Sequence, residues 1–261
     1  MRFARLEAKA AAMDLSRELA YKGNFLMKGV AFVITDFIGP ILTLLIYSTT
    51  LGIPGWTIYE FLLLQGSLII FSGLGHLFVL ALPYDVIRAI DKGEFDKYLI
   101  KPYPPLLYLI TQSVLVEGLI EMFAGVFIVA VAMWNLSITV FSVNFLLYVG
   151  IVLFGLLFQA GVMILISSLS FLFVKSDALM HLYYKLSDFA RWPLTVYSPL
   201  LKLLLIFLVP VAISSFFPAK VLLDGFSASL LWQAFLPVLA FLAVAVWCWN
   251  MAMRRYASAG G

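Results

Sequence analysis

The chain has 261 residues, of which 64% are hydrophobic and only 12% charged, and its mean hydropathy is +1.05. One core of this size cannot hide so much apolar surface, so a water-soluble protein is excluded and a membrane protein is indicated. The net charge of +3 is too small and too dispersed to indicate a nucleic-acid partner.

The first segment, residues 1–24, predicts an amphipathic helix that lies on the membrane surface. Apolar residues recur at helical spacing, and Arg2, Arg5 and Lys9 favour anionic lipid headgroups. The alternative is a solvated leader that only sets the topology. The segment lacks the continuous apolar core of a secretory signal, so we expect it to remain on the mature protein.

Six apolar runs follow, and each is long enough to predict a membrane-spanning helix, because a span needs about 20 residues. They cover residues 25–49, 58–82, 106–134, 141–174, 200–217 and 230–251. The fourth run exceeds the bilayer core, so we expect it to tilt, kink or extend into the cytoplasm. The predicted fold class is therefore an all-α polytopic membrane protein with a six-span domain over residues 25–253.

The distribution of basic residues predicts the orientation of these spans. Sixteen of the 17 Lys and Arg residues fall in the termini and in the loops on the same side, and the opposite loops hold only Lys220. By the positive-inside rule, both termini face the cytoplasm, as do the charged loop at 84–105 and the tail at 254–261.

The sequence contains none of the common motifs for binding nucleotides or metals. It has no phosphate-binding loop of the G-x-x-x-x-G-K-[ST] type, no G-x-G-x-x-G and no H-E-x-x-H. His76 and His181 stand far apart, and Cys248 lies alone in an apolar run, so we interpret all three as packing or interfacial residues. No ATPase site, cofactor or metal site is predicted on this chain.

Apart from Glu60 near the start of the second span, three acidic residues lie within the predicted spans, where charge is costly: Asp36, Glu117 and Glu121. Glu117 and Glu121 are four positions apart and share a helix face. They either form a proton or cation relay, or bind a neighbouring helix through hydrogen bonds. Asp36 precedes a kink expected at Pro40, and the same two readings apply to it.

The loop at 84–105 is charged, amphipathic and nearly balanced in sign, which suits contact with a protein better than contact with lipid. Its stretch 89–107 resembles the G-x-[LF]-D-x-x-L-[LIV]-[RK]-P-x-x-P-L signature of type-2 ABC exporter permeases, in the branch of small six-span subunits. The matching residues are Gly93, Phe95, Asp96, Leu99, Ile100, Lys101, Pro102, Pro105 and Leu106.

The resemblance covers most of the chain. Residues 20–25 are similar to the family's Tyr-Arg-x-Asn-Phe entry to the first span, with Lys22 in place of arginine. Residues 53–57 resemble the Gly-Trp-Thr opening of the second span. Residues 189–225 resemble the family's aromatic-Pro, Tyr-x-Pro, Val-Pro-x-Ala and Phe-Pro-Ala series, with Trp192 where tyrosine is common.

The resemblance implies a permease subunit, without an ATPase site of its own, of an ATP-driven exporter in the plasma (inner) membrane. Such permeases work in pairs, either as two copies or with a related permease, and each binds one of two ATP-binding subunits that hold ATP and Mg²⁺. The N-terminal helix and the loop would transmit closure of the ATPase to the spans. The implied coupling residues are Arg88, Asp91, Lys92, Gly93, Glu94, Asp96, Lys97, Lys101 and Pro102.

The resemblance also implies an external gate made by Phe217, Pro218, Lys220 and Asp224, although an ordinary outer loop would have the same sequence. Two other functions stay open. One is a proton- or ion-coupled secondary transporter that uses Glu117 and Glu121. The other is an intramembrane lipid-modifying enzyme, for which the sequence has no clustered Asp-Asp, His-Asp or Ser-His pair. The substrate cannot be read from the sequence.

Overall fold

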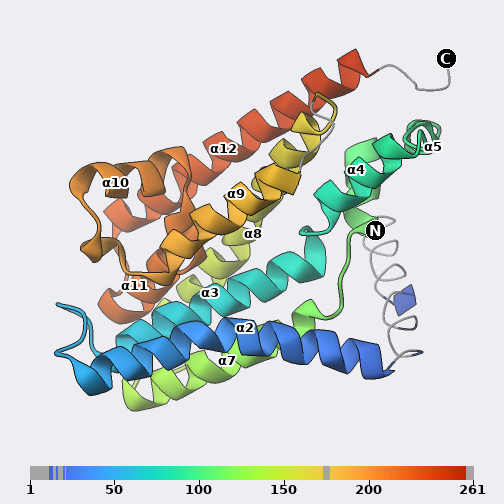
Figure 1. Ribbon diagram of the computed structural model, residues 1–261. Helices are drawn as coiled ribbons and strands as arrows, with labels where there is room; N and C mark the ends of the chain where they lie inside the picture. Colours follow the sequence, from blue (N-terminus) through green and yellow to red (C-terminus); the bar gives the residue numbers. More distant parts are fainter. Residues whose placement is uncertain (1–11, 14–15, 17–19, 21, 173–176, 257–261) are drawn as a thin grey trace.

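The computed structural model describes residues 12–13, 16, 20, 22–172 and 177–256, with the side chains of residues 24 and 177 left undescribed. These residues form helices and turns and no strand (Figure 1). The helix expected over residues 1–24 lies largely outside the described residues, as do Lys175 and the tail from residue 257. The predicted all-α fold with several membrane spans is confirmed.

The helices that we use below are labelled as in Figure 1. They are α2 (Lys22–Thr49), α3 (Ile58–Phe78), α4 (Leu82–Asp91), α5 (Asp96–Leu99), α6 (Pro105–Gln112), α7 (Gly118–Asn135), α8 (Val143–Leu169), α9 (Asp177–Ser187), α10 (Pro199–Leu203), α11 (Phe216–Asp224) and α12 (Ala228–Arg255). Short 3₁₀ turns cover Asp188–Arg191, Leu194–Val196 and Val211–Ser214, and Leu204–Leu208 form a π-helical turn.

Within the described ranges, five stretches are long and apolar enough to cross a membrane. They are Phe25–Thr49, Ile58–Asp91, Gly118–Asn135, Val143–Leu169 and Ala228–Arg255. The first, second, fourth and sixth predicted spans correspond to α2, α3, α8 and α12. Helix α8 ends at Leu169, whereas the fourth predicted span extends to residue 174.

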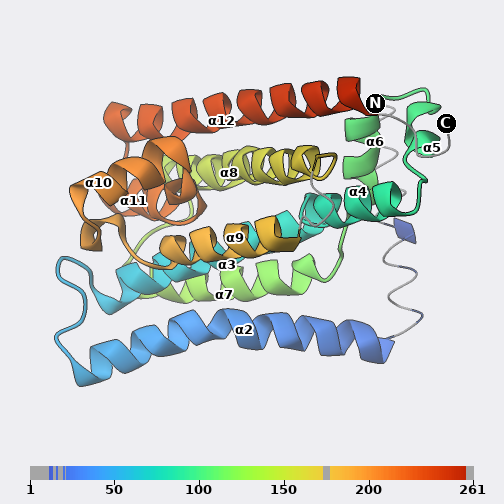
Figure 2. The same ribbon diagram turned by 45° about the horizontal axis from the view of Figure 1, so that its top comes forward.

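The third predicted span, 106–134, is wrong as one helix. It breaks into α6 and α7 at residues 113–117, and Figure 2 shows α6 running across the direction of α7. At the break, the Ser113 hydroxyl lies 3.1 Å from Asp85 Oδ2 and 3.0 Å from the Leu109 carbonyl oxygen. These bonds anchor the break to α4, so α7 alone makes the crossing.

The fifth predicted span, 200–217, is also wrong. This run contains α10, the π-helical turn and a 3₁₀ turn, and Pro210 lacks the N–H that a continuous helix would need. Both α8 and α12 run from the left to the right of Figure 1, so the chain must return between them. It does so through α9 and the turn at Asp188–Arg191, while α10 and α11 lie together at the left end.

Close packing of α3 against α7 forms the centre of the molecule. A Cβ atom added at Gly73 would lie 2.5 Å from the Met122 backbone nitrogen, and one added at Gly118 would lie 2.5 Å from the Gly73 carbonyl oxygen. Gly66 and Gly125 make a second contact of this kind, two helical turns away. Small residues thus bring the two backbones together, which is the usual means of close helix packing in membranes.

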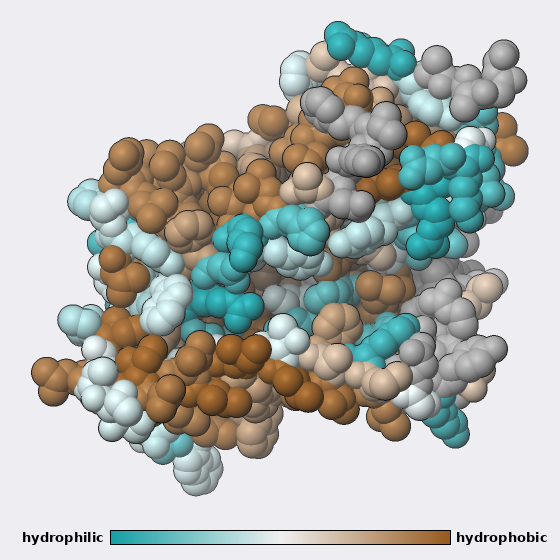
Figure 3. All heavy atoms as spheres, viewed as in Figure 1, coloured by the Kyte–Doolittle hydropathy of each residue, from teal (hydrophilic) through white to brown (hydrophobic). Residues whose placement is uncertain are grey.

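The outer surface is largely apolar. Figure 3 shows continuous hydrophobic surface over α2 and over α10 and α12, with a hydrophilic strip between them along α9. A second hydrophilic area covers α4 and α5 at the right end of the view. The strip along α9 leads to the largest group of polar side chains inside the bundle.

Candidate functional site

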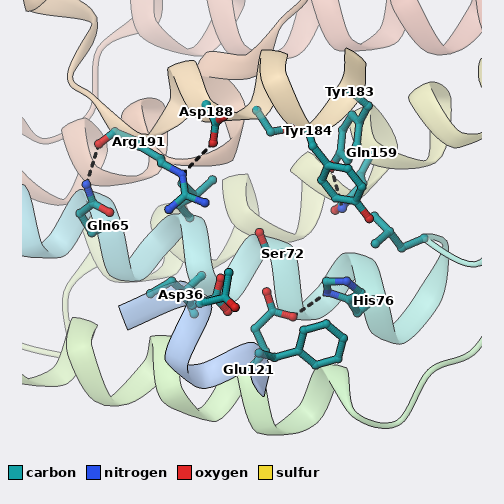
Figure 4. Close-up of a pocket in the computed structure, with 16 residues that line it drawn as sticks. Asp36, Gln65, Ser72, His76, Glu121, Gln159, Tyr183, Tyr184, Asp188 and Arg191 are labelled. Carbon is teal, nitrogen blue, oxygen red and sulfur yellow. Dashed lines mark hydrogen bonds and ion pairs between the residues drawn. The ribbon is translucent and has the colours of Figure 1, made fainter. Parts of the chain in front are cut away.

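A cavity of about 320 Å³ lies between α2, α3 and α9, with α7 and α8 behind it (Figure 4). Its walls combine ionisable, amide and aromatic side chains with a few aliphatic ones. They are Phe32, Thr35 and Asp36 of α2, Gln65, Leu68, Ile69, Ser72 and His76 of α3, Leu80, Glu121, Gln159, Tyr183, Tyr184, Ser187, Asp188 and Arg191.

The floor of the cavity holds a contact between a histidine of α3 and a buried glutamate of α7. His76 Nδ1 lies 2.6 Å from Glu121 Oε2, and the Glu121 side chain is 2% exposed. The Phe32 ring packs on the imidazole with its centroid 4.8 Å away, so α2 closes over the pair. The sequence analysis treated His76 as a packing residue and missed this partner, because the two residues stand 45 positions apart.

Asp36 comes to the same place from α2. Its side chain is directed at Glu121 in Figure 4, so two carboxyl groups meet inside the bundle. Asp36 Oδ2 is buried and has no hydrogen-bond partner among the described residues. The helix continues through Pro40, the position where we expected a kink.

The opposite wall is held by hydrogen bonds to the segment after α9. Gln65 Nε2 donates to the carbonyl oxygen of Arg191 (2.7 Å), and Arg191 Nε donates to Asp188 Oδ1 (3.0 Å). Gln159 Nε2 donates to the Tyr183 hydroxyl (3.0 Å). The Gln159 side chain is buried, and its Oε1 has no partner within the described part of the chain.

Glu117 does not join this cavity. Although it lies one turn before Glu121, its Oε1 accepts a hydrogen bond from Lys28 Nζ at 2.7 Å, and its side chain is 5% exposed. The two glutamates therefore bind different partners, one on α2 and one on α3. The relay interpretation of the pair stays a prediction.

The predicted coupling loop forms a compact projection at the right end of Figure 1. Leu82, Val86, Ala89 and Phe95 are buried. The Phe95 ring packs against Phe171 (4.9 Å between centroids) and Tyr256 (5.1 Å), at the ends of α8 and α12. The loop is thus fixed to two long helices through its apolar side.

Most charged residues of this loop lie on its outer side. Arg88, Asp91, Lys92, Glu94, Lys97 and Lys101 are exposed, with Gly93 and Pro102, while Asp96 is half-buried. Gly93 has φ +64°, which favours glycine at the turn between α4 and α5. The Lys97 ammonium beside Glu94 holds the pKa of that carboxyl below its usual range through a hydrogen bond.

The predicted gate residues belong to α11 at the other end. Phe217 and Pro218 are buried, and Lys220 Nζ lies 2.9 Å from Asp224 Oδ2 and 5.3 Å from the centroid of the Trp56 ring. Trp56 Nε1 donates to Thr195 Oγ1 at 3.0 Å. This end of the bundle is therefore closed by packed aromatic side chains.

In the ranges that the structure describes, no group of three or more His, Cys, Asp or Glu side chains could hold a metal ion. Comparison with curated proteins and with solved structures found no match. The sequence profile described as ABC-2 family transporter protein matches residues 32–260, which include the cavity, the loop and α11. The chain belongs to this family, so it is the membrane-embedded permease component of an ABC transporter and works with an ATP-binding subunit.

Proposed function

We propose that the chain forms half of the translocation pathway of an exporter, paired with a second permease and two ATP-binding subunits. The family match from residue 32 to residue 260 carries the proposal. The cavity between α2, α3 and α9 supports it, because a path for polar cargo needs hydrophilic walls inside an apolar bundle. The direction of transport rests on the resemblance of the loop to type-2 exporters.

The coupling surface is the outer side of the loop. Ile100 is 82% exposed and Leu99 43% exposed, among the charged residues of the same projection. Exposed apolar side chains next to mixed charge are typical of a protein contact. Because Phe95 packs on the ends of α8 and α12, movement of a bound ATPase would be passed directly to those helices.

We infer from the positive-inside rule that the loop end faces the cytoplasm, and from the resemblance that the membrane is the plasma membrane. Arg88, Lys92, Lys97 and Lys101 lie there with Arg254 and Arg255 of α12. Lys220 of α11 and Lys202 of α10 stand at the opposite end, so the bias is smaller than the sixteen to one counted from the sequence but keeps its direction. In this orientation α11 closes the outer mouth, and we propose that Phe217, Pro218, Lys220 and Asp224 act as the external gate.

The test is purification of the tagged chain from its native membrane in mild detergent, followed by mass spectrometry of the intact complex. We expect two permease chains and two ATP-binding subunits, and the masses distinguish two copies of this chain from a pair of different permeases. A homomer without an ATP-binding subunit would contradict the proposal and favour the secondary transporter.

The variant Ile100→Asp tests the coupling surface. We expect it to lose the ATP-binding subunit while the permease pair persists, because a charge replaces an apolar contact. The matched control is Leu51→Asp, which changes a fully exposed leucine in the loop at the other end of the bundle. Equal retention of the ATP-binding subunit by both variants would refute the assignment of the loop.

A further inference from the structure

We propose that the cavity between α2, α3 and α9 binds an organic ammonium group at the point where Asp36 and Glu121 meet. The inference rests on the proposed function, and it names the chemical class of the cargo: a small organic amine in its protonated form. Three observations carry it, namely the charge balance of the walls, two buried acceptor atoms and the mixture of apolar and polar lining.

The walls contain more negative than positive side chains. Asp188 is offset by Arg191, whose Nε lies 3.0 Å from Asp188 Oδ1. Glu121 contacts the His76 imidazole. Asp36 interacts with the same Arg191 guanidinium as Asp188, so three carboxyl groups face at most two cationic side chains. Two carboxylates that meet in a medium of low polarity repel each other strongly, so a cation between them is stabilised by both.

Two buried acceptor atoms in the walls lack a donor, and one of them is independent of the acidic pair. Gln159 is 1% exposed, lines the cavity and leaves Oε1 unpartnered within the described ranges. Asp36 Oδ2 is also buried and has no hydrogen-bond partner within the described ranges. Because buried polar atoms in proteins are almost always satisfied, these oxygens indicate that a ligand with N–H donors enters the cavity.

The rest of the lining favours an organic cation over an inorganic one. Phe32, Tyr184 and Leu68 contribute aromatic and aliphatic surface, which gives nothing to a bare metal ion but binds the hydrocarbon part of an amine. The volume of about 320 Å³ is within the range for small organic ligands.

The test measures binding to the purified full-length chain in lipid nanodiscs by titration calorimetry. The probe is 2-phenylethylammonium, and the neutral control is 2-phenylethanol, which has nearly the same shape. We expect the ammonium to bind and the alcohol to bind at least about tenfold more weakly. Asp36→Asn and Glu121→Gln should each weaken ammonium binding by about tenfold or more, because each removes a charge-assisted contact.

The matched control is Glu117→Gln, which neutralises a buried glutamate on the same helix end but outside the cavity, where it contacts Lys28. This variant should bind 2-phenylethylammonium with the same affinity as the unchanged chain. If Glu121→Gln does not fold, the binding result for Asp36→Asn alone tests the proposal. Asp36 is only half-buried, so this substitution should be easier for the fold to accept. The folded state of each variant is checked by size-exclusion chromatography and circular dichroism.

Three results would overturn the proposal. The first is equal binding of the alcohol, which would make the cavity an apolar site. The second is displacement of the probe by potassium chloride at a matching concentration, which would make it an inorganic cation site. The third is unchanged binding in both cavity variants. These measurements need no ATP-binding subunit, so a chain that retains this subunit but binds no amine refutes the cargo class alone.

Discussion

The contact between α3 and α7 allows a sharp test of the fold through Gly73→Ala. The added Cβ would lie 2.5 Å from the Met122 nitrogen and 2.8 Å from the Gly118 carbonyl oxygen, where ordinary contact needs at least 3.4 Å. Both neighbours are backbone atoms, so the helices must separate by about 0.9 Å. A gap of this size forfeits a quarter to a half of each dispersion contact, and we expect a loss of about 2–3 kcal/mol in the free energy of unfolding.

The assay is unfolding of the detergent-solubilised chain by sodium dodecyl sulfate, followed by circular dichroism. Gly150→Ala is the matched control, because it lies inside α8 and its Cβ would meet nothing within 4 Å. There the higher helix propensity of alanine should leave stability unchanged or raise it by up to about 1 kcal/mol. If the two variants differ by less than about 0.5 kcal/mol, the backbones of α3 and α7 are not in contact and the reasoning fails.

Three further predictions concern single contacts. Phe95→Ala should lower the free energy of unfolding by about 3–5 kcal/mol, because the ring is fully buried against Phe171 and Tyr256. A loss below about 1 kcal/mol in denaturant unfolding would contradict this packing. Lys28→Met should destabilise the chain by leaving Glu117 buried without this cation, and the double variant with Glu117→Gln should recover part of the loss in the same assay. Trp56→Phe removes the hydrogen bond to Thr195 and should cost about 1 kcal/mol; an unchanged unfolding midpoint would exclude that bond.

The positions of four spans could be predicted from hydropathy, because α2, α3, α8 and α12 are continuous apolar helices. The break before α7 could not be predicted from hydropathy. It depends on the hydrogen bond of Ser113 to Asp85 on α4, which is 28 positions away in the chain. The fifth predicted span was wrong for a different reason. Residues 200–217 are more apolar than α9, yet Figure 1 places α10 and α11 together at one end of the bundle.

The low hydropathy of α9 and the existence of the cavity have the same cause. Tyr183, Tyr184 and Ser187 of α9, with Asp188 and Arg191 after it, line the cavity, where polar side chains meet other polar side chains. The sequence did identify Asp36 and Glu121 as costly residues, but their meeting with each other and with His76 depends on the glycine contacts that bring α3 and α7 together. A helix that lines a path for polar cargo carries such side chains, so the composition of α9 agrees with the translocation pathway proposed above.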